Sequence, residues 1–166
     1  MSVIRTGGLW LAVALLAGCS AMPERLPLGT SQADVVQRLG EPTARYALSD
    51  GARLQYSGQP AGQWVYNVDL DAQGRVRSVT QELDESRFRS RIVVDSSTRE
   101  QLRLYLGRPA LVERTARFEG EVWTWRYFDY PMAAPRRLHV YLDTGGIVRR
   151  VDTTDEPREA EPPFPQ

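Results

Sequence analysis

Cysteine, histidine and lysine are almost absent from this sequence. Its 166 residues include one cysteine, Cys19, and one histidine, His139, and all 21 basic residues are arginine. A single cysteine excludes an internal disulfide. A zinc site built from cysteine and histidine is also excluded, because one residue of each type supplies too few ligands. The formal net charge is zero, so the chain has no excess of positive charge for binding nucleic acid.

Catalytic and cofactor motifs are also missing. The sequence has no P-loop, no GxGxxG and no nucleophile elbow. His139 lies between Leu138 and Val140 in an apolar alternation, so we expect an ordinary strand histidine that faces away from the core. We therefore expect a protein that is not an enzyme and that has no metal and no cofactor other than a covalent lipid on Cys19.

No apolar run is long enough to cross a bilayer, which takes about 20 residues. The longest run, residues 9–17, follows one early charge, Arg5, and leads into the motif Leu-Ala-Gly-Cys at residues 16–19. This order is typical of a secretory signal that ends in a lipobox. We expect cleavage before Cys19, the only cysteine of the chain.

The lipobox resembles that of lipoproteins cut by the lipoprotein signal peptidase. That resemblance implies a diacylglycerol thioether on Cys19 and an acylated amino group, and several acyl chains anchor a protein stably. Ser20 stands where an inner-membrane retention signal would usually have Asp. We expect the protein at the outer membrane, on its periplasmic face.

The rest of the chain contains a tandem duplication. Residues 36–42 (VQRLGEP) align with residues 103–109 (RLYLGRP) at an offset of 67. Residues 68–79 align with residues 140–151 at an offset of 72. The difference predicts a five-residue insertion, within loops, between the two matches.

Each repeat is expected to begin with a helix. In the first repeat Thr30 or Ser31 can cap the helix, and Gly40 ends it, with a proline two residues later. In the second repeat Ser97 and Glu100 have the spacing of a capping box, and the same Gly-x-Pro ends the helix.

After each helix the apolar period changes to two, which indicates strands with one buried face. Expected strands cover residues 54–57, 64–70 and 75–79 in the first repeat, and residues 122–128, 138–142 and 147–151 in the second. A helix followed by a three-stranded antiparallel sheet, twice over, is an α+β architecture.

The chain therefore divides into a signal peptide (1–18), an anchor linker (19–27), a first repeat (28–83), a second repeat (84–152) and a disordered tail (153–166). The second repeat is expected to open with a short amphipathic helix within residues 83–94.

The repeats resemble the SmpA/OmlA (BamE-like) family of outer-membrane lipoproteins. The resemblance rests on Gly-Thr-Ser at residues 29–31, Leu-Gly-x-Pro at 39–42, Val-x-Leu-Asp-x-x-Gly-x-Val at 68–76, and Trp-x-Trp-x-Tyr at 123–127. It covers most of residues 28–152. It implies a protein-binding scaffold that is accessory to outer-membrane β-barrel assembly or envelope integrity, with a partner in the β-barrel assembly machinery.

Tandem copies of such a unit also resemble the secreted β-lactamase inhibitor proteins, which bind enzymes through a concave sheet. The alternative function is thus a periplasmic inhibitor or ligand-binding module. Inhibition of a cell-wall enzyme, such as a β-lactamase, by the purified domain would distinguish the two.

Two groups of side chains are candidates for binding. Large aromatic residues on predicted sheet faces are either hot spots for a partner or, more simply, the core of two small repeats. They are Trp64, Tyr66, Trp123, Trp125 and Tyr127. The second group is placed to meet anionic lipid or an acidic partner, although adjacent arginines in a strand point to opposite faces and favour a solvated surface. It consists of Arg136, Arg137, Arg149 and Arg150.

Overall fold

The computed structural model describes residues 22–157. The expected signal peptide, Cys19 and residues 158–166 lie outside this range, and no helix within it is both long and apolar enough to cross a membrane. The helical elements are η1 (Pro23–Arg25), α1 (Gln32–Leu39), α2 (Glu85–Arg91) and α3 (Arg99–Leu106). The strands are β1 (Ala44–Leu48), β2 (Gly51–Ser57), β3 (Val65–Asp71), β4 (Val76–Gln81), β5 (Leu111–Thr115), β6 (Phe118–Asp129), β7 (Ala134–Asp143) and β8 (Val148–Asp155).

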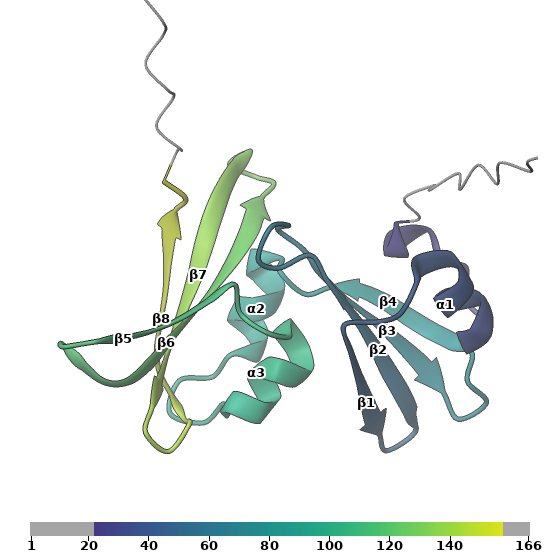
Figure 1. Cartoon of the computed structure of the whole chain (residues 1–166), viewed down its shortest axis with the longest axis horizontal. Helices are drawn as coiled ribbons and strands as arrows, with labels where there is room; N and C mark the ends of the chain where they lie inside the picture. The colour runs from purple at the N-terminus through teal and green to yellow at the C-terminus, as the bar shows by residue number, and fades with distance from the viewer. Residues whose placement is uncertain (1–21, 158–166) are drawn as a thin grey trace, which may run out of the picture.

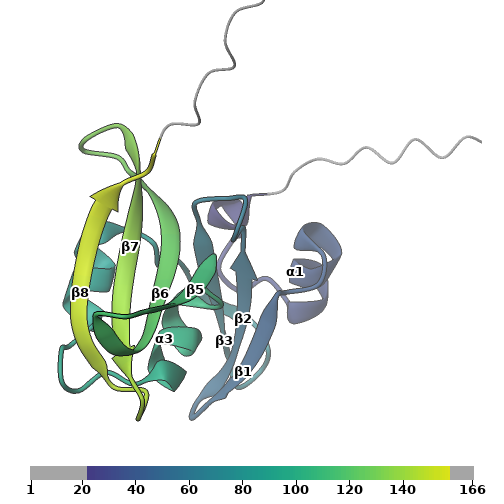
Figure 2. The same cartoon turned by 60° about the vertical axis from the view of Figure 1, so that its left-hand side comes forward.

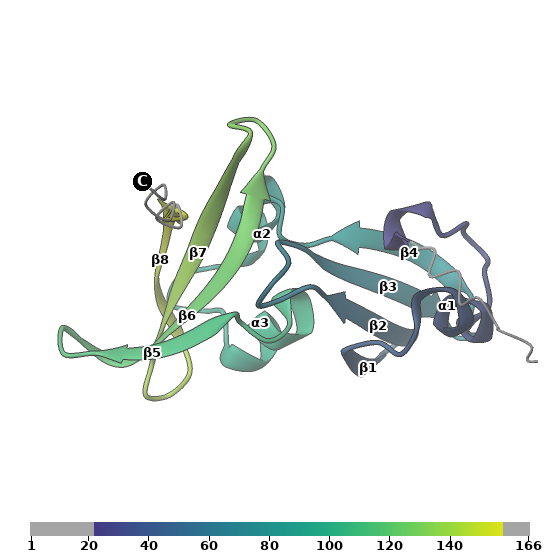
Figure 3. The same cartoon turned by 45° about the horizontal axis from the view of Figure 1, so that its top comes forward.

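The strands form two antiparallel sheets, β1-β2-β3-β4 and β5-β6-β7-β8, which we call sheet 1 and sheet 2. Helices α2 and α3 lie between the two sheets, and α1 lies on the far side of sheet 1 (Figure 1). The same succession is visible after rotation about either axis (Figures 2 and 3). Sheet 1 thus has α1 on one face and the second repeat on the other.

The α+β class and the two helix–sheet repeats agree with the sequence prediction, but each sheet has four strands and not three. The strands that were missed, β1 and β5, are the outermost strands next to β2 and β6. All five residues of β5 are exposed, and no buried residue marks β1. One face of β1 is only half-buried and β5 is exposed throughout, so neither strand has the strong apolar alternation of a strand with a buried face.

The order of the second repeat also continues further than expected. Strand β8 runs to Asp155, so the prediction that disorder begins at residue 153 is wrong for residues 153–155. The next residue, Glu156, is held by an ion pair with Arg126. A polar strand end that is held by main-chain pairing with β7 gives no apolar signal in the sequence.

The helix ends follow the expected chemistry with one correction. The Ser31 hydroxyl caps α1 by accepting from the backbone of Asp34, and Gly40 ends it with a φ of 79°. Helix α3 is capped by Thr98, whose capping box is completed by Gln101 and not by the Ser97 and Glu100 pair that the sequence predicted. The Ser97 hydroxyl instead accepts from the backbone N–H of Val93 and so closes the preceding turn.

Matching glycines show where the five inserted residues lie. Gly51 is the first residue of β2, and Gly120 is the first residue of β6 that pairs with β7. These two glycines are 69 positions apart, a value between the repeat offsets of 67 and 72. In both, an added Cβ would lie 2.0 Å from a carbonyl oxygen, that of Leu70 or of Leu142. Two residues are therefore added around the β5–β6 hairpin and three around the longer β6–β7 hairpin.

Each repeat has its own apolar core. Helix α1 packs Val35 against the Leu54, Val68 and Leu70 face of sheet 1. Helices α2 and α3 pack against one face of sheet 2, and the largest side chains of sheet 2 lie in this core. Val65, from the other face of sheet 1, belongs to this second core and joins the two repeats.

Candidate functional site

The aromatic residues proposed for partner binding are mostly core. Trp123, Trp125 and Tyr127 are buried under α2 and α3, and Tyr66 is buried under α1. Trp64 is half-buried and packs against the same core as Tyr66. As contacts for a partner, the four buried residues are a wrong prediction, because two small repeats need these faces to fold.

The four arginines proposed to meet anionic groups do not form an open basic patch. Arg136 lies within 3.5 Å of Glu85 and Asp129, and Arg137 lies 3.5 Å from Glu156. The other two are likewise paired: Arg149 with Asp95 and Asp143, and Arg150 with Asp152. The predicted cationic surface is therefore locally neutralised, a correction that follows from acidic residues on neighbouring strands and turns.

His139 lies on the outer face of sheet 2, away from the core, as the sequence predicted. Its Nδ1 lies 2.9 Å from the Thr124 hydroxyl and its Nε2 lies 2.9 Å from the Thr154 hydroxyl. Burial lowers the pKa of His139, and the Arg137 guanidinium lowers it further. The imidazole is therefore a neutral cross-strand link at pH 7.

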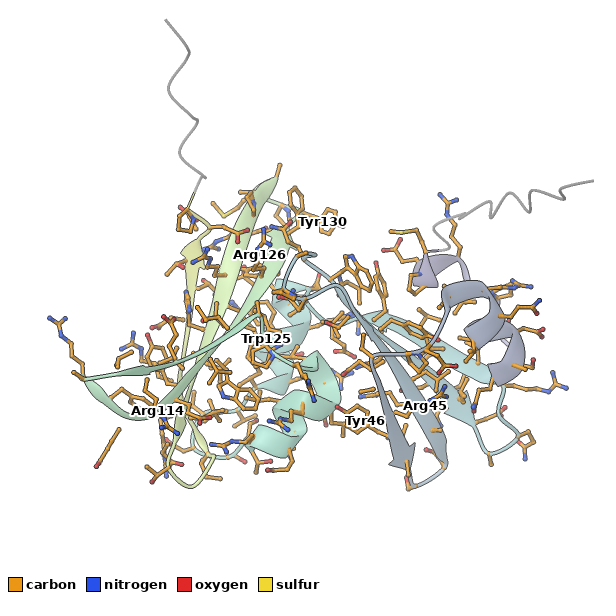
Figure 4. The ribbon with its side chains drawn as sticks, in the orientation of Figure 1. Arg45, Tyr46, Arg114, Trp125, Arg126 and Tyr130 are labelled. Carbon is orange, nitrogen blue, oxygen red and sulfur yellow. The ribbon has the colours of Figure 1, made fainter. Side chains whose placement is uncertain are left out.

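The second face of sheet 1 binds the end of helix α3. The last carbonyl groups of a helix have no partner within the helix, and they carry partial negative charge. Here the Arg53 guanidinium donates to the carbonyl of Leu104 at 3.0 Å, and the Asn67 amide donates to that of Tyr105 at 3.0 Å. The Tyr46 hydroxyl donates to the Arg103 carbonyl at 2.9 Å (Figure 4). The first repeat therefore caps a helix of the second.

Sheet 2 completes this cap from the other side. The indole Nε1 of Trp125 donates to the Leu106 carbonyl at 3.0 Å. Behind the cap, Arg53 forms a bidentate ion pair with Asp69, with distances of 2.6 and 2.9 Å between guanidinium nitrogens and carboxylate oxygens. At the neighbouring pair of positions on β2 and β3, the Gln55 amide donates to the Asn67 side chain at 3.0 Å. This buried polar layer fixes the orientation of α3 against sheet 1.

A second clasp joins the repeats beside this layer. The Gln59 amide donates to the Arg126 carbonyl at 2.7 Å and accepts from the Arg126 backbone N–H at 3.1 Å. The Arg126 guanidinium in turn donates to the carbonyl groups of Pro60 and Ala61. Glu156 pairs with Arg126 and accepts from Gln63 at 2.9 Å. The loop between β2 and β3 is thus bonded to sheet 2.

A cleft of about 710 Å³ opens between the helix cap and this clasp. Both repeats line it, with β1 and β2 on one side and the end of α3 on the other. Its lining residues are Thr43, Ala44, Tyr46, Gln55, Ser57, Gln59, Pro60, Arg103, Arg108 and Pro109. We call this feature the inter-repeat cleft.

The inter-repeat cleft is positively charged. Arg103 and Arg108 are exposed, and no acidic residue is among the lining side chains. Within residues 22–157, neither guanidinium takes part in an ion pair; that of Arg103 lies 5.3 Å from the centre of the Trp123 ring. Burial raises the pKa of the Tyr46 hydroxyl, against the effect of Arg103, so Tyr46 is a neutral hydrogen-bond donor.

The cleft chemistry suits binding. Its polar groups are guanidinium, amide and hydroxyl groups, which recognise carboxylate or phosphate oxygens and backbone carbonyls. The described lining holds no carboxylate, imidazole or thiol to act as a general base. No cluster of three metal-ligating side chains occurs in the part of the chain that the structure describes.

Sequence reasoning missed this site, although one signal was present. In β2 and β3 the residues that alternate with the apolar ones are Arg53, Gln55, Asn67 and Asp69, all polar. A sheet face that is exposed to solvent has the same pattern, so the alternation alone does not predict that the end of a helix covers this face of sheet 1.

The molecule is thus an α+β protein of two fused helix–sheet repeats with a basic cleft between them. No family model and no curated protein matches the chain, so the SmpA/OmlA resemblance stays a prediction. Among solved structures the chain is similar to a DUF4309 family protein, YjgB, from Bacillus subtilis subsp. subtilis str. 168. The identity is 16%, the match covers 76% of this chain and 79% of that one, and the TM-score is 0.31, a likeness that assigns no function.

Proposed function

We propose that this chain is a lipid-anchored envelope protein, not an enzyme, that holds an anionic segment of a protein partner in the inter-repeat cleft. The observation that carries the proposal is the pair of exposed guanidinium groups, Arg103 and Arg108, on a cleft without acidic lining. Guanidinium groups bind carboxylates in a bidentate geometry, and a preformed cleft reduces the entropy lost on binding.

The lipobox supplies the location in this proposal. A lipid on Cys19 would hold the repeats at the periplasmic face of the outer membrane and raise the local concentration of the cleft near membrane partners. By the resemblance described above, the partner is a component of the β-barrel assembly machinery, and the role is accessory to assembly or envelope integrity.

A crosslinking experiment tests the proposal. The tagged full chain is crosslinked in membranes and purified, beside a Cys19→Ala form and an Arg108→Glu form. We expect barrel-assembly components to be recovered with the native chain and lost with both variants. Arg38→Glu, an exposed reversal on α1 far from the cleft, is the matched control and should behave as the native chain.

Recovery of no barrel-assembly component would refute that role. Recovery of a cell-wall enzyme that the purified protein inhibits would favour the inhibitor function instead. Equal recovery with Arg108→Glu and with the native chain would exclude the cleft as the binding site.

A further inference from the structure

The β6–β7 hairpin ends in an exposed apolar tip. Tyr130 is 71% exposed and Met132 is 63% exposed, and Pro131 and Ala133 beside them are exposed as well. Residues 130–134 include no charged side chain. Scattered exposed apolar residues are ordinary, but a contiguous group at a protruding tip indicates contact with another apolar surface. We call residues 130–134 the apolar tip.

The apolar tip is an ordered turn. The Asp129 carboxylate accepts from the backbone N–H of Met132 at 3.2 Å, and the Tyr130 carbonyl accepts from that of Ala133 at 3.2 Å. The Tyr130 ring packs edge-on against Phe128, with 5.1 Å between ring centres. The apolar side chains are therefore presented to the outside by a fixed backbone and not by a collapsing loop.

The equivalent loop of the first repeat has a different role. Residues 58–64 fold onto the second repeat, where Gln59 bonds to the backbone of Arg126. That loop makes its contacts within the chain, whereas Tyr130 and Met132 remain exposed among the described residues. Within residues 22–157, the side chains of the apolar tip are therefore left open to another surface.

The start of the described chain and the apolar tip belong to different repeats but lie toward the same side of the molecule. Figures 1 and 2 show η1 and the β6–β7 hairpin in the upper part of the view, with the hairpin reaching higher, and Figure 4 places Tyr130 there. Met22, next to η1, is itself 45% exposed. Cys19 precedes Met22 by three residues, so even a fully extended chain keeps the two within about 10 Å.

We propose that the apolar tip is a second membrane contact, which inserts into the interfacial layer of the bilayer that holds the lipid of Cys19. This inference rests on the lipid anchor of the proposed function. The short tether holds the start of the described chain close to the bilayer, and tyrosine side chains are enriched in that layer, where apolar side chains can also be buried. Two points of attachment would also fix the direction in which the inter-repeat cleft faces.

A single fluorescent probe tests this contact. Because the only native cysteine carries the lipid, Met132→Cys provides one free thiol for the environment-sensitive fluorophore NBD. The lipidated full chain is reconstituted into vesicles of phosphatidylethanolamine and phosphatidylglycerol that contain a nitroxide-labelled lipid. Ser49→Cys, in the β1–β2 hairpin at the opposite end, is the matched control.

We expect blue-shifted emission and nitroxide quenching several-fold stronger at position 132 than at position 49. Replacing Tyr130 by Asp in the Met132→Cys chain should abolish the shift, because a carboxylate resists transfer from water. Equal emission at the two positions, or a shift that persists with Tyr130→Asp, would overturn the contact.

Mass spectrometry of the N-terminal peptide separates this result from the fate of the anchor. Lipid on Cys19 with an aqueous probe at position 132 removes the tip contact alone. A Cys19 without lipid removes the anchored function, and the contact with it.

Discussion

Glu82 is a carboxylate in an unfavourable place. Glu82 follows the last residue of β4, between the two repeats, and is 1% exposed. Neither of its carboxylate oxygens has a hydrogen bond among the described residues. The Arg91 guanidinium lies 3.3 Å away. Burial raises the pKa of Glu82 above its ordinary value of 4.5, and Arg91 only partly offsets this rise.

A pH-dependent stability follows for Glu82→Gln. A carboxyl group whose pKa is higher in the folded protein binds its proton more tightly there, so its contribution to the free energy of unfolding falls as pH rises above about 4.5. Glutamine does not ionise, so the variant should gain stability relative to the native protein between pH 4.5 and 7. Urea unfolding at a series of pH values measures this difference.

Glu119→Gln, at an exposed position of β6, is the control, and its curve should run parallel to that of the native protein. A constant difference between Glu82→Gln and the native protein across this pH range would contradict the expectation.

At the scale of elements, helices α1 and α3 end in the same way, but their ends have different surroundings. Gly40 and Gly107 both have positive φ, 79° and 68°, in the position that follows the helix. An added Cβ would meet nothing within 4 Å at Gly40 but would lie 2.7 Å from Gln55 Oε1 at Gly107. The difference arises because only α3 ends against the other repeat.

Alanine at these two glycines should therefore have unequal effects. Gly40→Ala is expected to lower the free energy of unfolding by about 1 kcal/mol, the usual cost of a left-handed residue with a side chain. Gly107→Ala should cost more, because it also displaces the Gln55 amide from its buried bonds. Chemical denaturation of the two variants and the native chain measures the loss in free energy of unfolding for each variant. Equal losses would contradict the expectation, because they would mean that the Gln55 side chain moves aside at no cost.

Helices were easier to predict than strands in this chain. The Gly-x-Pro ends of α1 and α3 are local signals, and both helices were found with correct ends at Gly40 and Gly107. Central strands such as β3 and β7 were visible from their alternation. Edge strands were not, because β5 buries no side chain, and the capping residue was misplaced by one because Ser97 and Thr98 have the same capping chemistry.

The inter-repeat cleft could not be predicted from local patterns. The contacts that bring its two walls together join residues 51 and 57 positions apart: Arg53 with Leu104 beside the cleft, and Tyr46 with Arg103 in its lining. In both pairs the acceptor is a main-chain carbonyl group, which every residue has. Pairing of a side chain with a distant main-chain atom leaves no signature in one sequence.

At the scale of the whole molecule, Arg53 couples the two repeats. It belongs to sheet 1, pairs with Asp69 and donates to the end of α3. Arg53→Leu leaves a buried carboxylate and a helix carbonyl without their donor, and removal of one partner of such a pair typically costs about 3 kcal/mol. Since α3 belongs to the second repeat, we expect both repeats to lose stability together.

Urea unfolding of the chain without residues 1–18, in a Trp64→Phe background, measures this coupling, because Trp10 is then absent and Trp123 and Trp125 report on the second repeat. We expect one transition, with fluorescence and circular dichroism shifted alike by Arg53→Leu. Arg77→Leu, which breaks only the exposed pair with Asp50, should shift it little. Fluorescence that does not respond to Arg53→Leu would show that the repeats unfold independently.

The contact between sheet 1 and the end of α3 has no counterpart on sheet 2 within residues 22–157. Sheet 1 accepts the next helix through Gln55 and Asn67, and the positions that correspond in sheet 2 are Thr124 and His139, which bond to each other and to Thr154. At these two positions sheet 2 therefore lacks the amide donors that Gln55 and Asn67 supply in sheet 1. The two repeats are arranged head-to-tail, as in a solenoid, where each unit contacts only its neighbours, and Thr124 and His139 give the outer face of sheet 2 a different chemistry from the face that binds α3.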